Sequence, residues 1–239
     1  KLLTFADRAR LADLVRTADS VFAVAFSPDG KRLATGGADR AIRVYDVATG
    51  AEQLVIEDHA DWVMDVAWNA DGSKLASASR DKTSKVFDMN TGDSLVTFNG
   101  HGAPVFGAAF SADGNQVVTS GGDKQIRVWN TADAKELRAI GGFNEKIFRI
   151  KVTGDGQVFS SSADKTARIH SIADGKELKS FAGHNDWVYT VDFNAATKKL
   201  ATGAYDGEVR LWNVEDGKQV VSFIAAPGYN PEQTASAAK

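Results

Sequence analysis

Three sets of side chains in this sequence combine a histidine, a hydroxyl and an acid, which are the groups of a nucleophilic catalytic triad. In each set the hydroxyl lies 18 residues after the histidine, and the acid lies four residues after the hydroxyl. An aromatic ring follows six residues after the acid. The sets are His59, Ser77, Asp81 and Phe87; His101, Thr119, Asp123 and Trp129; and His184, Thr202, Asp206 and Trp212.

A structural role explains these sets better than catalysis. A catalytic site occurs once in a chain, whereas this pattern recurs at a fixed period. An aspartate in a tight turn can accept hydrogen bonds from the imidazole and from nearby backbone N–H groups. The imidazole then reaches the hydroxyl, which contacts the indole N–H of the third strand, and three strands are tied together. We therefore predict no catalytic residue and no enzymatic activity.

Metal and cofactor sites are also not predicted. The four histidines lie in different units, and none is paired with another at ligand spacing. The Asp-Gly dipeptides fit hairpin turns, because no D-x-D-x-D run of a calcium loop accompanies them. The absence of cysteine excludes thiol catalysis, disulfides and cysteine-bound zinc.

An internal repeat sets the positions of these residues. Asp39, Asp81, Asp123, Asp164 and Asp206 are spaced 42, 42, 41 and 42 residues apart. Each unit holds four short alternating runs, separated by turn dipeptides such as Asp29-Gly30 and Thr49-Gly50. Four strands in roughly 42 residues, without helical periodicity, are typical of the blades of a β-propeller.

The motifs resemble those of the WD-repeat family, bacterial members included. They are "GH" at 100–101 and 183–184, "SPDG" at 27–30, "RVWN" at 127–130 and "RLWN" at 210–213. In that family the histidine, hydroxyl, aspartate and tryptophan form a structural tetrad. The sequence departs from the pattern at Thr17 and Phe143, which replace the histidine, and at Tyr45, Phe87 and His170, which replace the tryptophan.

We accordingly predict an all-β WD-repeat propeller of five complete four-stranded blades and the end of a preceding one. Residues 1–14 align with the outer strands of an incomplete blade, and residues 224–239 are predicted to be a linker or disordered tail. The five blades are expected within residues 15–223, at about 19–57, 58–99, 100–140, 141–181 and 182–223. The family's rings have six to eight blades, so we expect missing blades or a partner chain at the two open ends. The start at Lys1 suggests a trimmed or processed product.

Partner-binding residues are predicted where the units differ beside their repeated Asp turns. We call the rim that carries these turns the top face, and in WD-repeat proteins the equivalent positions bind peptides and proteins. Aromatic residues, Met and Arg are enriched at interface hot spots. The candidates are Phe22, Trp62, Met64, Arg80, Phe106, Lys146, Phe148, Trp187, Tyr189 and Tyr205. For Phe22, Phe106 and Phe148, plugging of the central channel is an equally good interpretation.

The bulk composition favours a protein partner. The net charge of −3 and the mixed charges disfavour nucleic acid binding. Basic residues recur at Arg43, Lys85, Arg127, Arg168 and Arg210, where we expect weak surface ion pairs with local acids or carboxamides such as Asp46. No apolar run is long enough for a membrane span. A chain without cysteine suits the cytoplasm and the bacterial periplasm alike.

The leading prediction is a non-enzymatic interaction scaffold, binding through its top face, as part of a larger propeller or multidomain protein. The alternative is a propeller module of a multidomain enzyme or cofactor-binding protein whose chemistry lies outside this chain. A site within the channel is disfavoured, because the channel positions are mostly apolar and no non-repeating His, Asp or Glu is expected to converge there.

Overall fold

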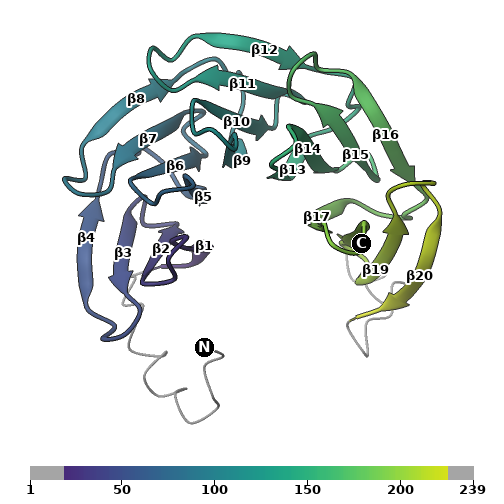
Figure 1. The fold of residues 1–239 in the computed structure, drawn as a ribbon, viewed down its shortest axis with the longest axis horizontal. Coiled ribbons are helices and arrows are strands. Elements are labelled where there is room, and N and C mark those ends of the chain that lie inside the picture. The colour runs from purple at the N-terminus through teal and green to yellow at the C-terminus, as the bar shows by residue number, and fades with distance from the viewer. Residues whose placement is uncertain (1–18, 226–239) are drawn as a thin grey trace, which may run out of the picture.

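The computed structural model describes residues 19–225, and in this part of the chain all regular elements are strands. Twenty strands form five antiparallel sheets, each of four strands in chain order. The sheets lie side by side around an arc, with their first strands innermost (Figure 1). The predicted all-β fold with four-stranded blades is thus confirmed. Residues 1–14 and most of the predicted tail lie outside the described residues.

The strand bounds follow the repeat. The first blade holds β1–β4 (Val21–Phe26, Arg32–Gly37, Ile42–Asp46, Glu52–Ile56) and the second β5–β8 (Val63–Trp68, Lys74–Ser79, Ser84–Asp88, Ser94–Phe98). The third holds β9–β12 (Val105–Phe110, Gln116–Gly121, Ile126–Asn130, Glu136–Ile140) and the fourth β13–β16 (Ile147–Val152, Gln157–Ser162, Thr166–Ser171, Glu177–Ala182). The fifth holds β17–β20 (Val188–Asn194, Lys199–Ala204, Glu208–Asn213, Gln219–Ile224).

Turn chemistry explains why each chain segment reverses where it does. In the first hairpin Gly30 has φ +69°, a left-handed conformation that glycine adopts at little cost. The carboxylate of Asp29 accepts hydrogen bonds from the Ser27 hydroxyl at 2.6 Å and from the Lys31 N–H at 3.0 Å. This local bonding fixes the turn and holds β1 and β2 in register.

Every innermost strand contains a β-bulge directly after its fixed apolar residue. The register of β1 against β2 shifts between Val21 and Ala23, and the same shift recurs in the other four blades. A bulge inserts one extra residue and re-aims its side chain. The extra residues are Phe22, Met64, Phe106, Phe148 and Tyr189.

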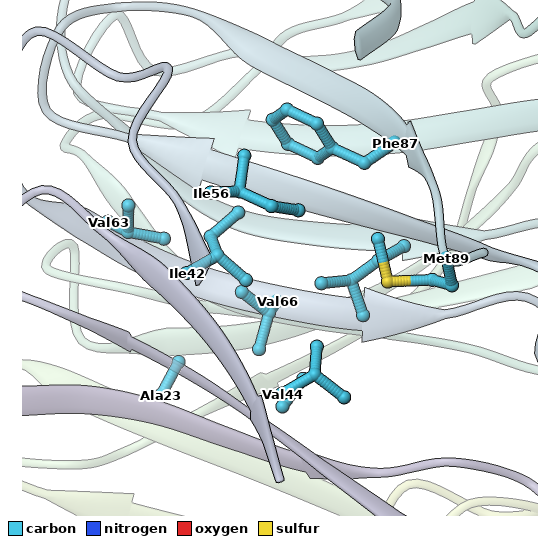
Figure 2. Packing of buried hydrophobic residues seen from close by; sticks show 10 residues of the cluster. Ala23, Ile42, Val44, Ile56, Val63, Val66, Phe87 and Met89 are labelled. Carbon is cyan, nitrogen blue, oxygen red and sulfur yellow. The ribbon is translucent and has the colours of Figure 1, made fainter. Parts of the chain in front are cut away.

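The core consists of apolar layers between neighbouring blades. Figure 2 shows the layer between the first two, where Ile42 and Val44 of β3 pack with Val66 of β5 and Phe87 of β7. Burying such side chains contributes about 1.5–3 kcal/mol each. Similar layers lie between the following blades, so each blade is stabilised by its neighbours.

The arc is open between the first and fifth blades (Figure 1), and apolar side chains are exposed on both end faces. Val24 is 64 % exposed, whereas Val66, at the same repeat position in the second blade, is 4 % exposed. Phe223 is 50 % exposed, whereas its equivalent Phe98 is 1 % exposed. Within the described residues, the end blades therefore have no neighbours that cover these positions as in the other blades.

Candidate interaction surface

The histidine sets of the second and third blades form continuous hydrogen-bonded chains. His59 lies between Asp81, at 2.8 Å from Nδ1, and Ser77, at 2.7 Å from Nε2. His101 similarly contacts Asp123 at 2.9 Å and Thr119 at 2.7 Å. The Trp129 indole N–H donates to the Thr119 hydroxyl at 2.8 Å, whereas Phe87 has no donor to offer Ser77. Both imidazoles are buried, so these bonds satisfy polar groups that water does not reach.

The electrostatics of Asp123 match this arrangement. Burial acts to raise the pKa of its carboxyl, but hydrogen bonds and charge from His101 and Arg127 outweigh burial and lower the pKa to about 2. The carboxylate form is thus the one that the folded blade stabilises.

The fifth blade differs from the predicted tetrad. His184 Nε2 contacts the Thr202 hydroxyl at 2.7 Å, and the Trp212 indole N–H donates to it at 2.9 Å. The Asp206 carboxylate, however, accepts from the Glu208 N–H, and Glu208 Oε2 lies 3.2 Å from His184 Nδ1. That contact is within ion-pair distance but lacks hydrogen-bond geometry. Burial and the charge of Arg210 lower the pKa of His184, which favours the neutral form of its imidazole.

The recurring basic residues pair with acids other than the expected ones. Arg127 contacts Asp123 at 3.1 Å and Glu136 at 2.6 Å, so it binds the turn acid and the outer strand of its blade. Arg43 and Arg168 repeat this pattern. The acids that directly follow the aromatic residue, such as Asp46, instead accept hydrogen bonds within their own turns. The basic side chains are therefore neutralised within their blades.

Backbone hydrogen bonds bring the predicted partner-binding positions together at the top face. In each blade the residue before the turn aspartate donates its N–H to the carbonyl of the residue before the fixed apolar position. These bonds measure 2.8–2.9 Å and join Ala38 to Ser20, Arg80 to Trp62, Gly122 to Pro104, Ala163 to Lys146 and Tyr205 to Trp187. In every blade these bonds hold two variable residues beside each other. The bulge residue is the third variable residue at this rim.

Five rings from three blades form a continuous cluster at this rim, which we call the aromatic patch. It consists of Phe106, Phe148, Trp187, Tyr189 and Tyr205. The rings of Phe148 and Tyr189 stack with centroids 4.3 Å apart, and Tyr205 lies 5.8 Å from Tyr189 and 6.0 Å from Trp187. Trp187, Tyr189 and Tyr205 are exposed, whereas Phe106 and Phe148 are half-buried.

A smaller cluster lies on the first two blades. The rings of Phe22 and Trp62 are 5.2 Å apart, and the Arg80 guanidinium lies 4.6 Å from the Trp62 centroid. Asp61 is 3.5 Å from Arg80 and serves as its counter-ion. Met64 is half-buried at the bulge of β5. The ring contacts among the predicted partner-binding residues therefore form two clusters.

A charged pair at the centre of the arc contradicts the expectation that no lone acid converges there. Arg149 of β13 donates to Asp65 of β5 at 2.6 Å and to the Phe22 carbonyl of β1 at 3.2 Å. The second Asp65 oxygen accepts from the Ala108 N–H of β9 at 3.2 Å. Burial raises the pKa of Asp65, against the opposing charge of Arg149. Asp65 and Arg149 occupy the same repeat position, where the other blades have Ala, Gly and Thr. This variation is the sequence feature from which a charged pair at the centre could have been predicted.

Two further findings concern the described part of the chain. Within residues 19–225 no group of three His, Asp or Glu side chains is arranged to hold a metal ion. A search of the same residues finds no helix that is long and apolar enough to cross a membrane.

Comparisons with known proteins agree with the repeat. The family model described as WD domain, G-beta repeat, matches residues 12–46, 50–88, 92–130 and 175–213, which is more than half of the chain. The gap from 131 to 174 contains most of the fourth blade, where Phe143 and His170 replace the usual histidine and tryptophan. No curated protein sequence matches the chain.

Solved structures share the fold. The structure of U3-55K and the crystal structure of RRP9 WD40 repeats each match with a TM-score of 0.82 at 23 % identity. Each match covers 88 % of this chain, and this chain spans 66 % and 65 % of the two solved chains. At this identity the likeness establishes the architecture alone.

Proposed function

The chain belongs to the WD-repeat family, and we propose that it is a non-enzymatic scaffold that binds a protein or peptide through its top face. Members of the family generally serve as protein-interaction scaffolds. The observation that carries the proposal for this chain is the aromatic patch. Its rings occupy positions that vary between blades, so the repeat itself does not require them.

The energetics of the patch support a binding role. Large exposed aromatic residues in contact with one another are uncommon on a surface that faces only water. Burial of such rings beneath a partner, with their few rotatable bonds, is the usual origin of interface hot spots. The Asp65–Arg149 pair gives no comparable support to a site at the centre of the arc, because its hydrogen-bonding groups are already engaged with each other and with backbone.

Trp187→Ala tests this function. We expect affinity for the partner to fall by about 2 kcal/mol or more, because Trp187 lies in the middle of the exposed rings. The full chain, the variant and the control Leu178→Ala, another exposed apolar residue, would be compared by quantitative affinity capture and then by titration with the captured partner. The thermal unfolding midpoint should stay almost unchanged. A lowered midpoint with unchanged affinity would assign Trp187 to the core instead.

We also propose that the two open end faces are covered, by further blades or by a partner chain. The exposure of Val24 and Phe223 supports this, since the equivalent residues are buried or, for Ile150, partly buried in the blades that have neighbours. In that arrangement the top face of the complete assembly continues past the aromatic patch, and the chain is one part of a larger propeller or multidomain protein.

A further inference from the structure

Among residues 19–225, Lys146 is the cation that lies directly on the rings of the aromatic patch. The Lys146 ammonium lies 4.9 Å from the ring centroid of Trp187 and 5.7 Å from that of Phe148. Lys146 belongs to the fourth blade and Trp187 to the fifth, so the lysine reaches across the boundary between them. Cation–π attraction of this kind fixes the position of the ammonium while it remains only partly hydrated.

In the smaller cluster, by comparison, the cation over the ring has a carboxylate counter-ion. Arg80 lies over Trp62 in a similar arrangement, and Asp61 stands 3.5 Å away as its counter-ion. Lys146 has no carboxylate within ion-pair distance anywhere in residues 19–225. Asp186 occupies the repeat position of Asp61, and each accepts the N–H of the tryptophan that follows it at 2.8 Å, but Asp186 forms no ion pair with Lys146. One of two analogous sites therefore lacks its anion.

A second lysine adds to the same charge. Lys165 Nζ donates to the Asn185 carbonyl at 2.8 Å, beside the loop that leads into Trp187, and has no carboxylate partner among the described residues. In this part of the chain Lys146 and Lys165 thus both lack a carboxylate partner, whereas Glu145, which precedes Lys146 in the chain, pairs with Lys124 at 3.6 Å. A cationic ligand side chain would have to lie close to Lys146 and would be repelled, whereas a carboxylate would gain a charge-assisted hydrogen bond.

We propose that the aromatic patch recognises an acidic peptide, with an Asp or Glu carboxylate on Lys146 Nζ and adjacent apolar side chains on Tyr189 and Tyr205. This inference rests on the proposed top-face function and specifies its ligand. Single-stranded nucleic acid also combines anionic groups with stacking surfaces. The observations favour a peptide, because the chain is acidic overall and the two lysines do not form the basic groove that follows a nucleic acid backbone.

The test uses a displayed library of random peptides, selected on the full chain and in parallel on Lys146→Met and Trp187→Ala. Lys176→Met, a change of an exposed lysine outside the patch, is the matched control. Selected peptides and their Asp→Asn or Glu→Gln analogues would then be titrated by fluorescence anisotropy. We expect acid-rich peptides, an affinity loss of about tenfold on Lys146→Met or on neutralising the peptide acid, and less than the sum of the two losses when both are made.

The outcomes separate this inference from the function on which it rests. Peptides that bind without an acidic residue would contradict the acidic ligand and leave the scaffold function standing. The same holds for peptides whose affinity is unchanged by Lys146→Met and reduced by Asp186→Asn. Failure to enrich any peptide over Trp187→Ala would overturn both. Tight binding of labelled oligothymidylate that depends on Lys146 would replace the peptide by nucleic acid. An unchanged thermal unfolding midpoint for each variant would show that its change in affinity arises at the binding surface and not from loss of folding.

Discussion

At the scale of single residues, the repeated aspartates show how one sequence position acquires different partners. Asp123 accepts hydrogen bonds from His101 and Arg127, and these bonds and the charges of the two donors outweigh burial and lower its pKa. Asp206 holds the same position in the fifth blade, but Glu208, two residues further on, faces His184 in its place. The third-blade carboxylate therefore stabilises a buried imidazole, whereas the fifth-blade carboxylate mainly shapes a turn.

Asn substitutions at these two positions should accordingly differ in cost. Asp123→Asn should lower the free energy of unfolding by about 1–3 kcal/mol, because a charged acceptor is lost from buried donors. Asp206→Asn should cost less than about 0.5 kcal/mol, because an amide oxygen can still accept the Glu208 N–H. Chemical denaturation at pH 7 measures both values, and equal losses would contradict the role of Glu208.

The loss on Asp123→Asn should also depend on pH. The pKa of Asp123 is lowered on folding from 3.8 to about 2, so the folded state favours the carboxylate more than the unfolded state does. The resulting stability is present above pH ~4 and is lost as the pH falls towards 2. The difference between wild type and Asp123→Asn should therefore shrink over this range, as denaturation at successive pH values would show. A difference that grew on acidification would have the wrong sign.

At the scale of strands, the blades depend on close approach between innermost strands. A Cβ built on Gly107 of β9 would lie 2.7 Å from the Ser120 hydroxyl and 3.2 Å from the Ile150 side chain of β13. Gly107 lies at the repeat position that Asp65 and Arg149 occupy in the blades on either side. Its missing side chain thus permits the close packing of β9 on β13.

Gly107→Ala should destabilise the protein by about 1–3 kcal/mol, because the strands must separate to admit a methyl group. Gly154→Ala is the matched control, since a Cβ there meets nothing within 4 Å and its backbone is not left-handed. The control should change the unfolding midpoint little or raise it. Thermal denaturation compares the unfolding midpoints of the two variants. Similar midpoints would show that β9 and β13 can move apart without loss of stability.

The strands were predictable from the sequence because their signals are local. Alternating apolar residues and Asp-Gly turns define β1 to β20, and the histidine spacing predicts which side chains of the second and third blades meet. The sequence did not predict that Glu208 rather than Asp206 faces His184, because two acids two residues apart compete for one imidazole. The Asp65–Arg149 contact joins residues 84 apart and depends on the curvature of the arc, which no local pattern encodes.

At the scale of the whole molecule, five blades are held in an arc by contacts that do not close it. Arg149 ties the fourth blade to the second and to the first, so the curvature is braced across the centre. The outer faces of the first and fifth blades nevertheless stay apolar and exposed. Repeat proteins usually protect terminal faces with polar caps, and apolar faces of this kind drive association.

Phe223→Lys should therefore reduce self-association of the isolated chain without unfolding it. Phe223 lies on the open face of β20, where a lysine remains in water, whereas Phe98 holds the equivalent position in a buried layer. Phe98→Lys should destabilise the chain by more than about 3 kcal/mol, since an aromatic side chain is lost and a charge must be buried. Sedimentation velocity over a range of concentrations measures association, and thermal denaturation measures stability. A wild-type chain that stays monomeric at all concentrations would show that its end faces need no cover.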